Sequence, residues 1–298
     1  MNATAEASGV LDEIAAAVAR GECVLFLGAG VHAPPPEASS FSYPDEERPP
    51  IGSALSRRLA EKCNVLADYP DESPSNLQRM SLFYETTKGR MQLIREIEQA
   101  VQDGKRPSPA LRALAKLDFP LVITTNYDRL FERALLEAGK DPVVSVYSPE
   151  LDETDDYPGV PTAQKPFVCK LHGDIGRPDS IVITDEDYIQ FVLRMSDKNQ
   201  YDPVPMTFKF FFQKWTTLFV GYSLIDYNLR LLFKTLRWKV DKANIPDTYS
   251  VDLYPDPLIF DVWHNQRRYV KFVAEDIWKF VPELYRAVKG KELGDSDA

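Results

Sequence analysis

The sequence predicts an α/β fold in which a Rossmann-like parallel sheet carries helices on both faces and a helical insert. Short apolar runs typical of buried strands alternate with amphipathic helical stretches, as in repeated βαβ units. Several of these runs end in small or polar residues, as strands do beside a ligand crevice. With 298 residues, 44% of them hydrophobic, the chain is long enough to bury a large core.

The first elements are a helix, a strand and a glycine turn. Ser8 is placed to cap the first helix. The apolar run 24–27 follows as a strand, and Gly28, Ala29 and Gly30 form the turn after it. Glycines lack a Cβ atom, so backbone amides in such a turn can approach a phosphate closely. Because the third glycine of the full dinucleotide-binding fingerprint is missing, the turn alone is a weak signal.

A long loop and a group of helices are expected next. Residues 34–50 contain the runs PPP, PDEER and PP, which interrupt regular structure and predict a loop beside the glycine turn, placed to act as a lid. Amphipathic spacing then predicts a helical insert at about 51–118, between the first two strands of the sheet. Its expected helices are 51–63, 77–87, 91–101 and a short one starting at Ser108-Pro109.

Three more strands end in polar or glycine-containing turns. In an open parallel sheet the carboxyl ends of the strands share one edge, so the side chains on these turns are expected to face one ligand crevice. The strands and their turns are 121–125 with Asn126-Tyr127-Asp128, 167–171 with His172-Gly173-Asp174, and 215–220 with Gly221-Tyr222-Ser223.

The rest of the chain supplies the outer elements. The segment 141–166 is rich in Pro, Asp and Glu, and we expect it to be irregular. Two last strands are expected at 248–253 and 269–273, followed by a helix at 275–288 and a flexible polar tail at about 290–298.

Four motifs occur in a defined order along the chain. They are GAG at Gly28 to Gly30, TTNYD with Asn126 and Asp128, LHGD with His172, and VGYSLIDYN with Gly221, Ser223 and Asp226. Any single match could arise by chance, but the ordered set resembles the sirtuin superfamily, and in particular its bacterial sirtuin-like branch in antiphage defence proteins. The resemblance extends from about residue 21 to about residue 288, which implies one sirtuin-like NAD-binding domain over 1–298.

The resemblance implies a role for each motif. In sirtuins the glycine segment holds the pyrophosphate of NAD, the Asn and Asp shape the nicotinamide-ribose pocket, the His acts near the ribose hydroxyls, and the Gly-x-Ser turn meets the nucleotide. The implied catalytic residues are therefore Asn126 and His172. The implied NAD-binding residues are Gly28, Ala29, Gly30, Asp128, Gly221 and Ser223.

Deacylating sirtuins carry a zinc module with two Cys-x-x-Cys pairs, and this chain departs from that pattern. Its cysteines are Cys23, Cys63 and Cys169, and no two of them are spaced to hold one ion. We therefore expect no zinc and no other metal site. The segment 31–36 also lacks the Ser-rich continuation that deacylases have after the glycine turn.

By resemblance, the expected function is an NAD glycohydrolase that cleaves NAD to nicotinamide and ADP-ribose, acting as the toxic effector of an antiphage, abortive-infection system. Two other enzymes of the same kind stay open, a cyclase forming cyclic ADP-ribose and a protein deacylase, and so does a non-catalytic sensor of NAD or ADP-ribose. A toxic enzyme needs control, so we expect a homo-oligomer, a partner protein such as an ATPase or Argonaute-type protein, or both.

Charge and hydrophobicity limit the binding partners and the cellular location that we expect for this protein. The chain has 35 Lys and Arg against 45 Asp and Glu, a net charge of −10, which opposes direct nucleic-acid binding. No apolar stretch approaches the ~20 residues that span a bilayer, and the N-terminus lacks a signal-peptide pattern. These features predict a cytoplasmic protein without membrane contact.

Some candidate residues also have ordinary structural readings. Asp128 is well placed to cap the helix that follows it, so Asn126 is the stronger catalytic candidate. His172 stands inside a motif at a strand end, which favours a functional role. His32 borders the glycine turn and could touch a ligand, but we expect it to be a loop imidazole.

Overall fold

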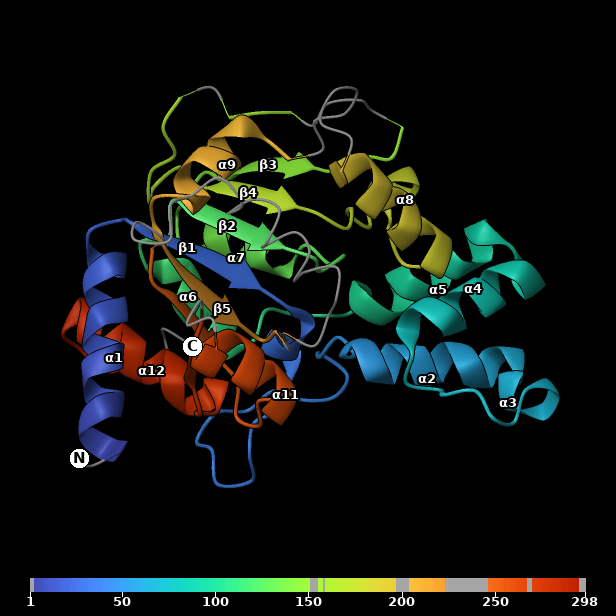
Figure 1. The fold of residues 1–298 in the computed structure, drawn as a ribbon, viewed down its shortest axis with the longest axis horizontal. Helices are drawn as coiled ribbons and strands as arrows, with labels where there is room; N and C mark the ends of the chain where they lie inside the picture. Colours follow the sequence, from blue (N-terminus) through green and yellow to red (C-terminus); the bar gives the residue numbers. More distant parts are fainter. Residues whose placement is uncertain are drawn as a thin grey trace.

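The computed structural model describes residues 3–150, 155–157, 159–196, 204–222, 224, 246–266 and 270–294. Its centre is a seven-stranded sheet, ordered β3-β4-β2-β1-β5-β6-β7 and parallel throughout (Figure 1). The strands are β1 (Cys23–Leu27), β2 (Leu121–Thr124), β3 (Val143–Val146), β4 (Phe167–Lys170), β5 (Thr216–Val220), β6 (Thr248–Val251) and β7 (Lys271–Val273). The predicted α/β class and parallel sheet are confirmed.

The central strands are apolar because both faces of the sheet are covered. Side chains alternate along β1, so Leu25 and Leu27 enter one core while Val24 and Phe26 enter the other. All five residues of β1 are buried. A strand buried on both sides reads as a continuous apolar run rather than an alternating one, which is why the sequence pattern identified it.

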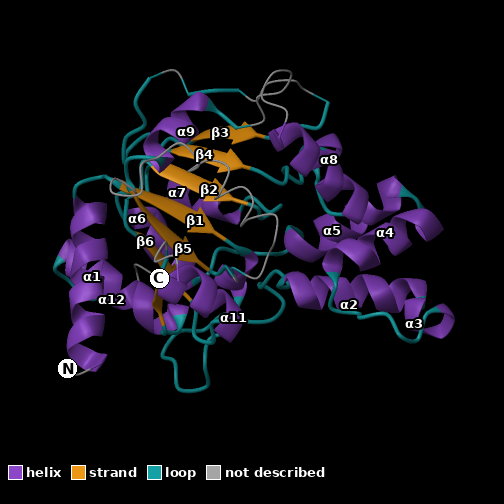
Figure 2. Ribbon diagram, viewed as in Figure 1, coloured by secondary structure: helices purple, strands orange, loops and turns teal. Residues whose placement is uncertain are grey.

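Helices pack on each face of the sheet (Figure 2). One core includes residues of α1 (Ala3–Ala19), α6 (Pro109–Lys116), α7 (Leu130–Glu137) and α12 (Ile277–Lys289). The opposite core includes residues of α8 (Asp185–Ser196), α9 (Met206–Phe212), α11 (Pro257–Phe260) and the π-helical turn η4 (Asp261–Gln266). The expected coverage of both faces is confirmed.

A helical block lies beyond the carboxyl ends of the strands, and in Figure 1 the strand arrows point toward it. It consists of α2 (Gly52–Cys63), α3 (Val65–Asp68), α4 (Leu77–Lys88) and α5 (Arg90–Val101). Its core joins Leu59 and Ile97 to Tyr127 and Ile183, which follow strands of the sheet. By contrast, α6 contacts α7 and α12, because its apolar face belongs to the core beside the sheet. Because α6 packs beside the sheet, the expected extension of the helical insert to residue 118 stays a prediction.

Two local expectations are wrong. Ser8 lies inside α1, which begins at Ala3, because the alanine-rich start of the chain continues the helix. The segment 141–166, expected to be irregular, contains β3. That strand is an edge strand of four residues, and its short run was obscured by the prolines and acidic residues around it.

Candidate functional site

Four neighbouring strands of the sheet end beside one another. In the order β4-β2-β1-β5, they are followed by His172, Asn126, Gly28 and Gly221. The strands β2, β3 and β4 all lie on one side of β1, and the chain then returns to place β5 on the other side of β1. Open α/β sheets bind ligands at such a switch point, outside the carboxyl ends of the strands. The expectation that these four turns share one edge is confirmed.

A cavity of about 500 Å³ opens at this edge. Its lining includes Ala29, Gly30, Asn126, Asp128, His172 and Gly221, all of which were candidate residues. The helical block forms the facing wall, and the loop 34–50 contributes its last two prolines. The volume lies in the range typical of sites for small molecules and cofactors. Ser223 and Asp226 lie outside the described residues.

The glycines at this edge hold two loops together. The N–H of Gly28 donates to the Val220 carbonyl at 3.0 Å, and the N–H of Gly30 donates to the Gly221 carbonyl at 2.9 Å. A Cβ atom on Gly28 would lie 2.4 Å from the Gly221 oxygen. Gly221 has φ +71°, a conformation that favours glycine. Close backbone packing therefore requires these glycines, and the N–H groups of Gly28 and Gly30 both have backbone partners.

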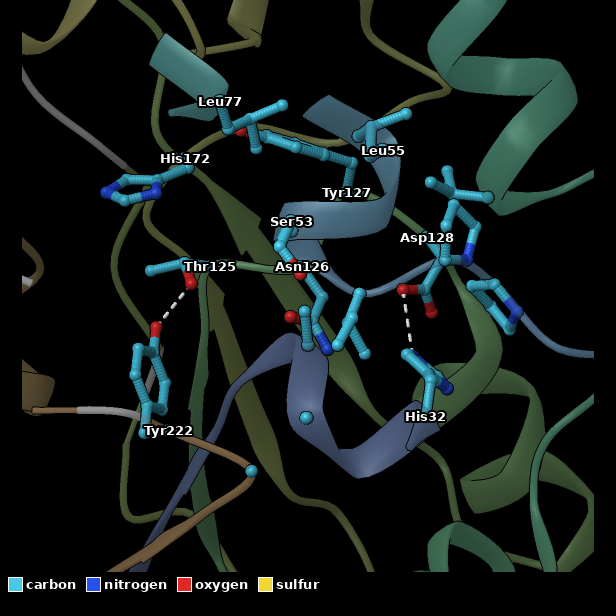
Figure 3. Close-up of a pocket in the computed structure, with 18 of the residues that line it drawn as sticks. His32, Ser53, Leu55, Leu77, Thr125, Asn126, Tyr127, Asp128, His172 and Tyr222 are labelled. Carbon is cyan, nitrogen blue, oxygen red and sulfur yellow. Dashed lines mark hydrogen bonds and ion pairs between the residues drawn. The ribbon is translucent and has the colours of Figure 1, made fainter. Parts of the chain in front are cut away.

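Asn126 stands in the cavity between two polar pairs. Figure 3 shows its side chain between the Thr125–Tyr222 hydroxyl pair and the Asp128–His32 pair. Its backbone N–H donates to Thr124 Oγ1 at 3.0 Å, which anchors the turn. The half-buried carboxamide makes no hydrogen bond to the part of the chain that the structure describes. It can therefore offer both a donor and an acceptor to a ligand.

Asp128 is buried directly before Arg129, the N-cap residue of α7, and its side chain binds the first N–H of the helix. Its Oδ1 accepts a hydrogen bond from the Leu130 N–H at 2.9 Å, and its Oδ2 lies 3.3 Å from His32 Nε2. Burial alone would raise the pKa of Asp128, but His32, the Lys170 ammonium and the Leu130 N–H together lower the pKa below its usual value. The site therefore holds a carboxylate, not a carboxylic acid.

His32 is not a loop imidazole, so that expectation is wrong. It lies in the short 3-10 helix η1 (Ala29–His32), is 2% exposed and lines the cavity. Its Nδ1 is 3.4 Å from the hydroxyl of Tyr43, which donates to the Arg106 carbonyl at 2.9 Å. Tyr43 is thus the buried anchor of the loop 34–50. A lone tyrosine in a proline-rich loop carried no sequence signal for this contact.

A buried lysine connects the two polar motifs, and the sequence reasoning missed it. Lys170 is fully buried and forms ion pairs with Glu132 at 3.0 Å and Asp174 at 2.7 Å, and its ammonium also donates to the Asp128 carbonyl. Burial lowers the pKa of Lys170, but the surrounding carboxylates outweigh burial and raise the pKa above its usual value. Asp174 is also paired with Arg129 at 2.6 Å. These charges hold the turn after β2 against the turn after β4.

His172 is buried and lines the cavity. Its Nδ1 lies 3.2 Å from the hydroxyl of Tyr188 on α8. The rings of Tyr188 and Phe191 both meet the imidazole edge to face. The ring is therefore held by one helix while its backbone follows β4.

Neither a metal-binding group nor a membrane-spanning helix is present among the described residues. Within those ranges, no three His, Cys, Asp or Glu side chains are grouped to hold a metal ion. The three cysteines are unpaired thiols. Of the helices that the structure describes, none is both long and apolar enough to cross a bilayer.

Comparison with known proteins identifies the family. The profile of the SIR2-like domain matches residues 120–272, which carry the strand ends that bear Asn126 and His172. The chain belongs to this SIR2-like family, and the resemblance seen in the motifs is confirmed.

Several curated relatives are similar to the chain. The NAD(+) hydrolase ThsA of Enterococcus faecium is 36% identical over 135 residues, 45% of this chain and 26% of that protein. Defense-associated sirtuin 2 of Bacillus subtilis is 25% identical over 251 residues, 83% of this chain and 22% of the relative. The NAD(+) hydrolase ThsA of Acinetobacter baumannii (strain 532279) is 26% identical over 229 residues, 76% and 42% respectively. The chain thus spans less than half the length of each of these three relatives.

Proposed function

We propose that this chain is an NAD glycohydrolase, which cleaves NAD with water to nicotinamide and ADP-ribose. The observation that carries the proposal is the cavity at the switch point of a SIR2-like sheet, lined by both Asn126 and His172. Relatives named NAD(+) hydrolase support the same reaction.

The cavity suits the hydrolysis of the bond between ribose and nicotinamide. The bond between ribose C1′ and the nicotinamide nitrogen breaks, and its electron pair neutralises the pyridinium ring as nicotinamide leaves. The oxygen of water bonds to C1′ and loses a proton. A cavity that holds the ribose and excludes bulk water favours the oxocarbenium-like transition state. No metal participates in this proposal, and NAD is the substrate.

The proposed roles follow the positions of the residues. The Asn126 carboxamide orients a ribose hydroxyl or the attacking water, and His172 takes up the proton. We assign NAD binding to Gly28, Ala29, Gly30, Asp128, Gly221 and Ser223. For the glycines, this binding acts through the shape of the two joined loops, because the amides of Gly28 and Gly30 are occupied.

We further propose that the enzyme is the toxic effector of an antiphage system in the cytoplasm. The relative named Defense-associated sirtuin 2 supports this setting. Control by self-association, or by a partner such as an ATPase or Argonaute-type protein, would keep the activity low in uninfected cells. The enzyme would act as one NAD-binding domain with a helical insert at about 51–118.

Incubating the purified protein with NAD and resolving the products by chromatography tests the reaction. Nicotinamide with ADP-ribose is the expected pair. Cyclic ADP-ribose would instead identify a cyclase, turnover that requires an acylated lysine peptide would identify a deacylase, and NAD binding without products would identify a sensor. Gln92→Ala, an exposed change on α5, serves as the control for substitutions in the cavity.

A further inference from the structure

The first turn of α8 contacts the imidazole of His172. Tyr188 lies in that turn, and its hydroxyl oxygen is 3.2 Å from His172 Nδ1. The two rings meet edge to face with their centroids 4.9 Å apart. Phe191, one turn further along α8, meets the same imidazole edge to face at 5.5 Å. Two side chains of one helix therefore set the orientation of the His172 ring.

A capping box fixes the turn that carries Tyr188. Thr184 Oγ1 accepts a hydrogen bond from the Asp187 N–H at 3.2 Å, and Asp187 Oδ2 accepts one from the Thr184 N–H at 3.0 Å. This reciprocal pair satisfies two free donors at the start of a helix and makes its first turn well defined. The Tyr188 N–H then donates to the Thr184 carbonyl at 3.1 Å. Tyr188 is thus placed by a rigid helix start.

The helical block reaches the same turn through Arg90, the first residue of α5. Arg90 Nη1 lies 2.9 Å from Asp187 Oδ2, and Arg90 Nη2 donates to the Ile181 carbonyl at 2.5 Å. Asp187 directly precedes Tyr188 in the chain. The ion pair therefore connects the wall of the cavity formed by the helical block to the residue that contacts His172.

We propose that Tyr188 is a positioning residue for His172: its hydroxyl oxygen accepts a hydrogen bond from Nδ1–H and so keeps the ring in the tautomer whose Nε2 takes up a proton. A neutral imidazole carries one N–H, and the hydrogen bond made by one nitrogen decides the state of the other. With the proton on Nδ1, the basic nitrogen is Nε2. A proton acceptor in the cavity needs this tautomer.

That His172 takes up a proton during NAD cleavage rests on the proposed function, whereas the tautomer of its ring does not. Two kinds of measurement therefore separate the two ideas. Kinetics depends on NAD cleavage, whereas the ¹⁵N spectrum of the histidines reports which ring nitrogen carries hydrogen whether or not NAD is cleaved.

The kinetic test uses Tyr188→Phe, which keeps the ring and removes the hydroxyl. We expect kcat to fall about ten- to a hundredfold with KM within about twofold, since substrate binding is retained and proton transfer is impaired. Tyr147→Phe is the matched control, because Tyr147 is buried, meets Phe191 edge to face at 5.0 Å, and has a hydroxyl without a hydrogen-bond partner among the described residues. An equal loss in both variants, or a rise in KM with kcat intact, would overturn the proposal.

The spectroscopic test uses the ¹⁵N-labelled full chain. It has three histidines, so the His172 signals are assigned by their disappearance in His172→Ala. We expect the Nδ1–H tautomer in the unsubstituted protein and a shift toward the Nε2–H tautomer in Tyr188→Phe. An Nε2–H tautomer at the outset, or an unchanged spectrum in the variant, would refute the positioning role. If the protein does not cleave NAD, the proposed reaction fails while this test still decides the tautomer.

Two substitutions on α5 test whether the ion pair between Arg90 and Asp187 affects His172. Arg90→Gln removes the ion pair to Asp187 and should lower kcat severalfold by loosening the start of α8. Arg95→Gln, an exposed arginine on the same helix, should leave kcat unchanged. The same kcat in both variants would show that the Arg90–Asp187 pair does not act on His172.

Discussion

The imidazole of His32 is paired with the carboxylate of Asp128 inside the cavity, with Nε2 3.3 Å from Oδ2. A carboxylate only accepts hydrogen bonds, so Nε2 carries a hydrogen. The other ring nitrogen meets the hydroxyl of Tyr43. One side chain therefore joins three segments: the turn after β1, the turn after β2 and the loop 34–50.

His32→Ala should destabilise the protein by about 1–3 kcal/mol, because it leaves the buried Asp128 carboxylate without its ring partner. Urea unfolding measures this loss. Asp128→Asn should cost a similar amount, and the double variant should cost clearly less than the sum of the two single changes. Strictly additive losses would mean that the two residues do not interact.

Acid should unfold the protein partly through Asp128 and Asp174. Burial raises the pKa of Asp174, but Lys170 and Arg129 outweigh burial and lower the pKa below its usual value, and His32 and Lys170 do the same for the pKa of Asp128. A lowered folded pKa contributes stability that is complete above the unfolded value of about 3.9 and is lost as the pH falls through the folded pKa. The urea concentration at the unfolding midpoint should therefore fall as the pH is lowered below about 4, and it should fall less steeply in Asp174→Asn. An equally steep drop in that variant would assign the acid sensitivity to other groups.

Asn126→Ala and His172→Ala should abolish NAD cleavage while the protein stays folded. Both residues line the cavity, on the turns that follow β2 and β4. Circular dichroism and thermal melting check the fold, and product chromatography checks the reaction. Turnover like that of the unsubstituted protein in either variant would remove that residue from the mechanism.

Gly28→Val should weaken NAD binding and also lower the melting temperature. Its Cβ would lie 2.4 Å from the Gly221 carbonyl oxygen, so the two loops must separate. Calorimetry with NAD and a thermal melt measure the two effects. Gly9→Ala is the control, since a Cβ there meets nothing within 4 Å and alanine favours the helix. Unchanged affinity in Gly28→Val would place the NAD phosphates away from these loops.

The isolated protein should cleave NAD slowly, and assembly should raise its specific activity. Pro49 and Pro50 of the loop 34–50 line the cavity, so a movement of this loop would change access to the site. A hundredfold rise needs only about 2.7 kcal/mol of differential interaction between closed and open states. NAD consumption measured against protein concentration, with and without a candidate partner, tests this. High activity that stays constant down to monomeric concentrations would contradict control by assembly.

The sequence by itself determined the fold class, four neighbouring strands of the sheet and the turns that follow them. These strands were readable because a parallel strand covered on both faces is apolar at every position, as Val24 to Leu27 are. The motifs at their ends placed Asn126 and His172 at one edge, since parallel strands bring their carboxyl ends together. The edge strand β3 escaped notice because its four residues stand among prolines and acids.

Only the tertiary structure decided which polar groups meet. Lys170 reads as one polar residue at the end of an apolar run, yet it pairs with the carboxylate of Glu132 on α7 and with that of Asp174 on the turn after β4. His32 and Tyr43 come together because the loop 34–50 folds back onto the turn after β1. Tyr188 reaches His172 because α8 covers that face of the sheet. Such contacts depend on the distances between segments that packing brings together, and a local sequence pattern carries no information about those distances.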